Sequence, residues 1–104
     1  MSSGPFRLIL SAEAREDIAE TARWYDEQEQ GLGREFTRAF RAATAVLERS
    51  PFIYQEIETE TRRVLLRRFP YQVIYKVRDN TVFIAGCFHI SRDPQQWRDR
   101  MSEL

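Results

Sequence analysis

The chain has 104 residues, of which 42% are hydrophobic and 31% charged, and its 16 Lys+Arg balance 16 Asp+Glu. This composition is typical of a globular protein, and the length predicts a single domain over residues 1–104. One cysteine and one histidine cannot supply an internal disulfide or the three or four ligands of a zinc site. We therefore expect neither a metal nor a cofactor.

The hydropathy pattern argues against a membrane or secreted protein. Apolar runs extend over only four or five residues, whereas a helix needs about 20 to span a bilayer. Residues 1–5 have neither the basic region nor the long apolar region of a secretory signal. The sequence predicts a cytoplasmic protein with no membrane partner.

The neutral total conceals two oppositely charged halves. Residues 1–60 carry 12 carboxylates and 7 arginines, a net charge of −5, whereas residues 61–104 carry 9 cations and 4 carboxylates, a net charge of +5. Such asymmetry suggests an acidic or polyanionic partner for the basic half. Pairing of basic strands with acidic helices inside one fold explains it equally well.

Two helices are expected in the first half, after a short strand over residues 6–10. Ser11 is a candidate N-cap, followed by acidic residues that favour the first turns of a helix over residues 12–28. Glycines at 31 and 33 interrupt the pattern. A second helix is marked by an apolar stripe at 36, 39, 40, 43 and 47 and ends at Ser50–Pro51.

The second half contains three runs typical of strands, at residues 62–69, 71–77 and 81–88, with a short turn at 78–80. Residues 52–61 are expected to connect the helices to the strands, and a short helix is expected after Pro94. The order β-α-α-β-β-β predicts an α+β fold. We expect an antiparallel sheet with a helical hairpin on one face and a short C-terminal segment.

The first of these three strands is basic and is a candidate binding segment. On an extended strand, Arg63 and Arg67 would share one face and Arg62 and Arg68 the other. Guanidinium groups bind phosphates and carboxylates bidentately, so this row could hold an RNA backbone or an acidic peptide. A solvated edge strand protected by its charges is the alternative interpretation.

A second candidate site follows the last strand. His89, the only histidine, lies near Arg92 at a junction between strand and loop, where binding groups are common. His89 is a candidate general acid or base, or else it closes the end of the sheet by hydrogen bonds to the backbone. Trp97 is expected to pack the C-terminal segment, and Cys87 is expected to be buried and inert.

The segments RRVLLRRFPYQVIYKV (62–77) and VFIAGCFHISRDP (82–94) resemble those of the RelE/ParE superfamily of toxins, and the likeness extends from about residue 6 to 100. The resemblance implies a toxin of a bacterial type II toxin–antitoxin system with a role in plasmid stabilisation. Its partner would be a cognate ParD-like antitoxin with a ribbon-helix-helix DNA-binding part. The toxin would then meet DNA only indirectly, through the antitoxin complex.

Two activities divide this superfamily, and the residues favour one of them. RelE-like members cut mRNA on the ribosome with a set of basic residues, whereas ParE-like members inhibit DNA gyrase. Arg63 and Arg92 match basic positions of the nuclease pattern, but Leu65 stands where lysine is expected and Gln72 where arginine is common. Loss of such cations weakens stabilisation of the transition state.

The sequence therefore favours a ParE-like, non-catalytic inhibitor of DNA gyrase. The expected contacts with target or antitoxin are Arg62, Arg63, Arg67, Arg68, Arg92 and Trp97. The alternative is a ribosome-dependent mRNA endonuclease that uses Arg63, His89 and Arg92, since some relatives use histidine. A small binding module without toxicity is the third interpretation.

Overall fold

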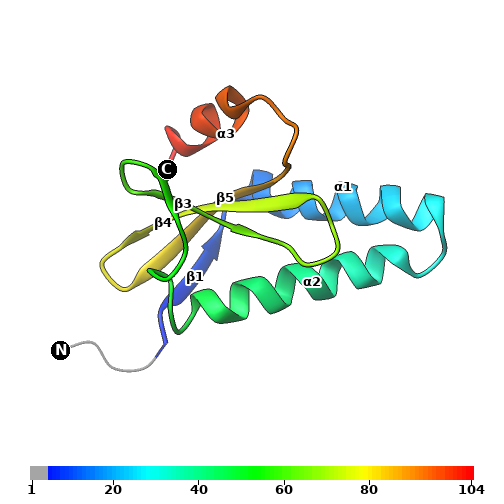
Figure 1. Cartoon of the computed structure of the whole chain (residues 1–104), viewed down its shortest axis with the longest axis horizontal. Helices are drawn as coiled ribbons and strands as arrows, with labels where there is room; N and C mark the ends of the chain where they lie inside the picture. The colour runs from blue at the N-terminus through cyan, green and yellow to red at the C-terminus, as the bar shows by residue number, and fades with distance from the viewer. Residues whose placement is uncertain (1–4) are drawn as a thin grey trace.

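A five-stranded sheet lies between two layers of helix in the computed structural model, which describes residues 5–104 (Figure 1). The N-terminal segment judged to lack a secretory signal falls almost entirely outside this range. The elements are β1 (Arg7–Leu10), α1 (Ala12–Gln28), α2 (Leu32–Leu47), β2 (Glu56–Glu58), β3 (Thr61–Leu65), β4 (Tyr71–Arg78), β5 (Thr81–His89) and α3 (Pro94–Met101).

The helical hairpin forms as the sequence predicts, except that α2 begins at Leu32, so that Gly33 lies inside it, and ends at Leu47 and not at Ser50–Pro51. Ser11 caps α1, and its hydroxyl accepts the N–H of Ala14 at 3.0 Å. Gly31 takes φ +92°, a left-handed conformation that glycine adopts without strain. Gly33 packs so closely on α1 that a Cβ there would lie 2.2 Å from the carbonyl oxygen of Ala22. The α+β fold with a helical hairpin and a C-terminal helix is confirmed.

The sheet is mixed, which corrects the expectation of a wholly antiparallel one. Its strand order is β1-β5-β4-β3-β2, and β1 pairs with β5 in parallel while the other pairs are antiparallel. The segment expected to be a connection also contributes an edge strand, β2. Within the described residues, no helix has the length and apolar character needed to cross a membrane.

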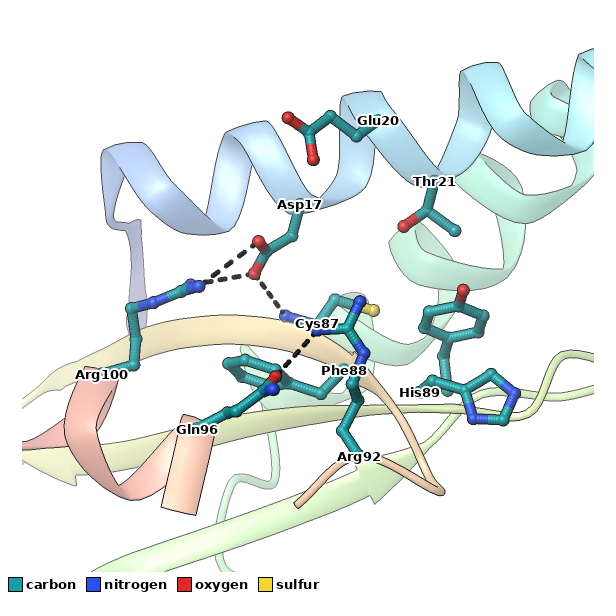
Figure 2. A pocket seen from close by; sticks show the side chains of 10 residues that line it. Asp17, Glu20, Thr21, Cys87, Phe88, His89, Arg92, Gln96 and Arg100 are labelled. Carbon is teal, nitrogen blue, oxygen red and sulfur yellow. Dashed lines mark hydrogen bonds and ion pairs between the residues drawn. The ribbon is translucent and has the colours of Figure 1, made fainter. Parts of the chain in front are cut away.

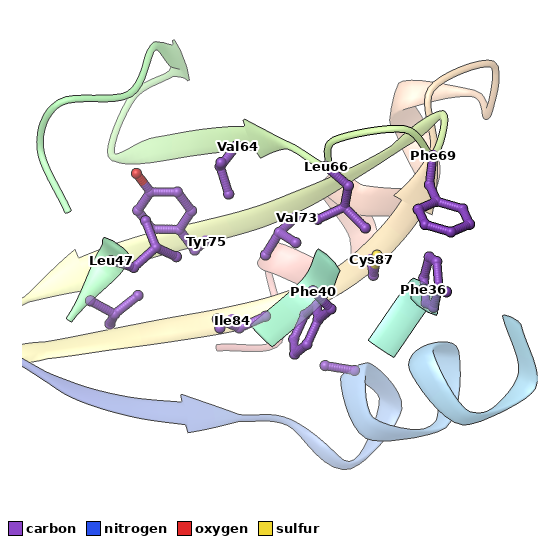
Figure 3. Packing of buried hydrophobic residues seen from close by; sticks show 12 residues of the cluster. Phe36, Phe40, Leu47, Val64, Leu66, Phe69, Val73, Tyr75, Ile84 and Cys87 are labelled. Atoms are coloured by element: carbon purple, nitrogen blue, oxygen red, sulfur yellow. The ribbon is translucent and has the colours of Figure 1, made fainter. Parts of the chain in front are cut away.

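The main core lies between the helical hairpin and the sheet (Figure 3). Phe36, Phe40 and Leu47 of α2 form the buried stripe predicted from their spacing, and they pack against Val73 and Tyr75. The Tyr75 hydroxyl donates to the carbonyl oxygen of Pro51 at 2.7 Å, and burial raises the pKa of Tyr75 to about 12. A smaller cluster on the other face of the sheet contains Ile74, Phe88 and Trp97, and α3 covers it.

A β-bulge in β5 determines which side chains reach the helical face. Tyr75 pairs with Ile84 and Ile74 with Gly86, so Ala85 is an extra residue without a partner on β4. Before the bulge, Ile84 faces the main core, and after it Cys87 does. His89 shares the parity of Cys87 and therefore lies on the helical side of the sheet.

Candidate functional site

The predicted row of arginines is divided among three surroundings, because β3 ends at Leu65. Arg62 donates to the carbonyl oxygens of Phe52 at 3.3 Å and Tyr54 at 2.7 Å. Arg63 donates to the side-chain oxygen of Gln72 at 3.2 Å. The prediction of one continuous strand over residues 62–69 is wrong, because the strand ends at Leu65.

Arg67 and Arg68 lie in the loop before β4 and turn toward α2. Arg68 adopts φ +71° and pairs with Glu35 of α2 at 2.8 Å. Arg67 and Arg68 line a hollow together with Arg38. The basic residues therefore concentrate at the junction of α2 with this loop and do not run along a strand.

Next to this junction an apolar groove separates α2 from β3. We call it the α2–β3 groove; its volume is about 220 Å³, and its lining residues are Ala39, Ala42, Ala43, Val46, Tyr54, Val64, Leu65 and Arg67. The helix contributes mostly small side chains, Ala39, Ala42 and Ala43 among them. Leu65 is 55% exposed at its edge. Arg67 lines both the groove and the hollow, which places the basic residues at one end of the groove.

A second concave surface lies between α1, the end of β5 and α3 (Figure 2). We call it the α1–β5 cleft; its volume is about 300 Å³, and its lining residues are Asp17, Glu20, Thr21, Tyr71, Cys87, Phe88, His89, Arg92, Gln96 and Arg100. Glu20, Thr21, Tyr71, His89 and Arg92 also line an adjoining hollow of about 620 Å³ that includes Trp24 and Pro70. The two spaces form one continuous surface.

An ion pair organises one end of the α1–β5 cleft. Arg100 of α3 donates to Asp17 of α1 at 2.9 Å and to the carbonyl oxygen of Ala85, the bulge residue, at 3.0 Å. The same Asp17 oxygen accepts the N–H of Cys87 at 3.2 Å. A Cβ on Gly86 would lie 2.6 Å from Asp17 Oδ2. The residue at 86 must therefore be a glycine for this arrangement to form.

His89 occupies the middle of the α1–β5 cleft in a defined tautomer. Its ring packs edge-on against Tyr71 with centroids 5.2 Å apart. The backbone N–H of Ser91 donates to Nδ1 at 3.0 Å, and the Ser91 hydroxyl lies 2.8 Å from the same nitrogen. Because Nδ1 accepts, the neutral ring carries its proton on Nε2.

Arg92 lies beside His89 and is held by α3, since its guanidinium donates to Gln96 at 2.8 Å. Figure 2 shows the guanidinium of Arg92 in the cleft, below α1. Of the sequence-predicted candidates, the structure therefore brings His89 and Arg92 together. Arg63 is not with them, because it pairs with Ile74 and contacts Gln72 on the face of the sheet that α3 covers.

Trp97 is buried in the smaller cluster with Ile74 and Phe88. It fixes α3 to the sheet, as expected for a packing residue, and offers a binding partner only a small exposed part of its ring. Cys87 is buried as predicted. Burial, followed by the Asp17 carboxylate, raises the pKa of its thiol to about 12, so the thiol is un-ionised at neutral pH.

Sequence reasoning missed Asp17, Thr21, Tyr71 and Arg100 as residues of one site. In the sequence, Asp17 is one of the acidic residues after Ser11 that favour the first turns of a helix. Its spacing offers a further signal, because it lies three residues after buried Ala14 and four before Thr21, on the side of α1 that faces the sheet. No local pattern marks Arg100 as its partner, since 83 residues separate the two.

Comparison with solved structures shows a similar fold in chains of toxin–antitoxin systems. The chain is similar to a structure of the chromosomal ParDE toxin–antitoxin system from P. aeruginosa, with a TM-score of 0.61 and 12% identity over 81% of this chain and 95% of that chain. For the RelBE2 toxin–antitoxin complex from Mycobacterium tuberculosis, the TM-score is 0.58 and the sequence identity 21%, over 82% of this chain and 98% of that chain. For a mutant of E. coli toxin RelE in the free state, the TM-score is 0.60 and the sequence identity 14%, over 95% of this chain and 96% of that chain.

Sequence comparison identifies the family. A search of curated proteins finds no significant match. The family model for the ParE toxin of the type II toxin–antitoxin system parDE matches residues 8–94, a range that includes both helices of the hairpin and all five strands except the first residue of β1. The chain therefore belongs to the ParE toxin family of type II toxin–antitoxin systems.

Proposed function

We propose that this chain is a toxin that inhibits DNA gyrase without catalysis and is neutralised by a ParD-like antitoxin. The proposal rests on the residues that stand at the positions of the nuclease pattern, most of which lack a free positive charge. Leu65 and Gln72 have no charge, and Arg63 already donates to Gln72, which is only 4% exposed. Stabilising the phosphate in a cleavage transition state requires several free cationic donors in one place.

The separation of His89 from Arg63 supports the same conclusion. His89 faces the helical hairpin, whereas Arg63 lies on the face covered by α3. A general base and the cation that stabilises the reacting phosphate must contact the same substrate group. An inhibitor that acts by binding places no such demand on these two residues.

The α2–β3 groove is our proposed docking surface for the antitoxin. Its small apolar residues on α2 suit the apolar face of an amphipathic helix. The exposed Arg38 and Arg67 beside it favour acidic residues on the flank of that helix. Because the whole chain has no net charge, we expect contact with DNA only through the antitoxin.

Two assays test this function side by side. The purified chain is expected to inhibit supercoiling by DNA gyrase, and addition of the antitoxin is expected to restore it. In a translating ribosome assay the chain is expected to leave the mRNA intact. Codon-positioned cleavage together with normal supercoiling would contradict the proposal.

One observation favours the RelE-like alternative, because His89 and Arg92 share the α1–β5 cleft. Under that alternative these residues and Arg63 would cut mRNA on the ribosome. The double variant His89→Ala/Arg92→Ala would then lose all cleavage. Undiminished toxicity of this variant would contradict the alternative.

A further inference from the structure

The α1–β5 cleft contains hydrogen-bond donors that lack an acceptor. Among residues 5–104, the hydroxyls of Thr21 and Tyr71 and the Nε2 of His89 have no hydrogen-bond partner, although all three line the cleft. The guanidinium of Arg92 has one partner, Gln96. Because a guanidinium offers five N–H groups, most of the Arg92 donors are free.

Of the two arginines that line the cleft, only Arg92 has a positive charge that no neighbouring carboxylate within residues 5–104 neutralises. Asp17 and Arg100 neutralise each other, and Asp17 also accepts the Cys87 N–H. Figure 2 shows the Glu20 carboxylate directed away from Arg92 and His89, at the rim beside α1. Donors that converge around a single free cation are suited to an oxygen anion such as a carboxylate.

The adjoining hollow is suited to an apolar group. Trp24 is 53% exposed there, and its ring packs edge-on against Tyr25 with centroids 5.1 Å apart. An exposed, supported tryptophan beside a charged donor is the composition of a hot spot in a protein interface. The surface therefore favours an acidic side chain and, close to it, an apolar one.

A nucleic acid strand fits this surface less well than a protein segment. Phosphate-binding grooves need a row of cations, and the cleft has only one that is free. Glu13, Glu16 and Glu20 lie exposed along α1 and would repel a polyanion. A single carboxylate in an otherwise neutral peptide avoids most of this repulsion.

We propose that the α1–β5 cleft binds a segment of the toxin's protein target, with a carboxylate held by Arg92 and His89 and an apolar side chain against Trp24. This inference rests on the proposed function and assigns the target to a surface separate from the α2–β3 groove. Antitoxin recognition and target recognition then depend on different residues. A mutation can therefore abolish antitoxin binding without affecting target binding, or target binding without affecting antitoxin binding.

The experiment compares cleft variants with a groove variant in two assays. Arg92→Gln and Trp24→Ala are each expected to raise the toxin concentration for half-inhibition of gyrase supercoiling at least tenfold, and to abolish growth arrest on induction. Both are expected to bind the antitoxin within twofold of wild type. Leu65→Asp in the groove is expected to do the reverse, with antitoxin affinity reduced at least tenfold and gyrase inhibition unchanged.

A matched pair of acids tests the charge of the bound group. Glu20→Gln is expected to lower the half-inhibitory concentration two- to threefold, because it removes a negative charge near the bound carboxylate. Glu27→Gln on the same helix lies outside the cleft and is expected to have no effect. Weaker inhibition by Glu20→Gln would show that the bound group is basic, which would overturn the proposal.

The other possible outcomes of these assays also support or overturn the proposed role of the cleft. Cleft variants that melt like wild type and stay fully toxic overturn the proposal, as do variants that lose antitoxin binding to the same extent. It is also overturned if Arg92→Gln weakens binding of a labelled single-stranded oligonucleotide and leaves gyrase inhibition intact.

The behaviour of the wild-type chain separates this proposal from the proposed gyrase target. A wild-type chain that arrests growth without inhibiting gyrase refutes only the gyrase target, and the cleft is still supported if the cleft variants alone lose the growth arrest. A wild-type chain with neither effect overturns both.

Discussion

Asp17 and Arg100 form an ion pair at 2.9 Å although 83 residues separate them in the chain. The pair joins α1 to α3, and through the carbonyl oxygen of Ala85 and the N–H of Cys87 it joins both helices to β5. The side chains are only 20% and 21% exposed. One carboxylate and one guanidinium therefore connect three elements at the end of the cleft.

Removal of this ion pair is expected to destabilise the fold. Asp17→Ala removes the side-chain acceptor of the Cys87 N–H and leaves the Arg100 guanidinium with the carbonyl oxygen of Ala85 as its acceptor, a loss that typically costs about 2–3 kcal/mol. Urea denaturation measures the change. Glu60→Ala is the control, because its pair with Arg78 is 3.6 Å long and more than half exposed, and such pairs contribute less than about 1 kcal/mol. Equal effects of the two variants would contradict the role assigned to Asp17.

The close contact of the two hairpin helices makes Gly33 sensitive to substitution. Replacing glycine by alanine inside a helix normally stabilises it by about 1 kcal/mol. Here the added Cβ would meet the carbonyl oxygen of Ala22 at 2.2 Å, so Gly33→Ala is expected to destabilise the protein by about 2 kcal/mol. Thermal unfolding measures the sign of the change. Ala42→Gly, on the exposed side of α2, should cost only about 1 kcal/mol from its lower helix propensity. A Gly33→Ala variant as stable as wild type would disprove the close contact.

The buried thiol of Cys87 is expected to reduce stability at alkaline pH. Its pKa is about 12 in the folded chain against an ordinary value of 9.0, so the unfolded state loses the proton first. Stability is therefore full below about pH 9 and falls as the pH rises toward 12. Between pH 8 and 10 the wild type should lose about 1 kcal/mol more than Cys87→Ala. Denaturant titrations across this range measure both slopes, and parallel slopes would contradict the raised pKa.

The tautomer of His89 can be tested by NMR. Because the Ser91 N–H donates to Nδ1 at 3.0 Å, the neutral ring is expected to be protonated on Nε2. Long-range proton–nitrogen correlation spectra distinguish the two nitrogens. Ser91→Ala keeps the backbone donor and removes only the hydroxyl, so it should keep this tautomer. A proton on Nδ1 in the wild type would contradict the arrangement.

Local patterns were sufficient for the helices. A capping serine, the glycine at 31 between the helices and an apolar stripe are signals within a few residues, so α1 and most of α2 followed from the sequence. The end of β3 was not visible in this way. Arg68 takes a left-handed conformation, which interrupts the extended backbone between β3 and β4. Arg67 and Arg68 are therefore not aligned with Arg62 and Arg63 along one strand.

The candidate site was only partly predictable for a similar reason. His89 and Arg92 are close in sequence, so their association could be expected. The face that His89 occupies depends on the bulge at Ala85. The carbonyl oxygen of Ala85 accepts from Arg100 and Ser11, which lie at opposite ends of the chain. Strict alternation over residues 81–89 would have placed His89 on the other face.

The parallel pairing of β1 with β5 has a consequence for synthesis. Within the sheet β1 hydrogen-bonds only to β5, and Arg7 pairs with Thr81. During translation β1 must therefore wait until residues 81–84 have left the ribosome before its partner strand exists. Such distant contacts form late and slow the folding of small proteins. Until β5 is available the newly made chain has no completed sheet, an interval in which an antitoxin already present can reach it.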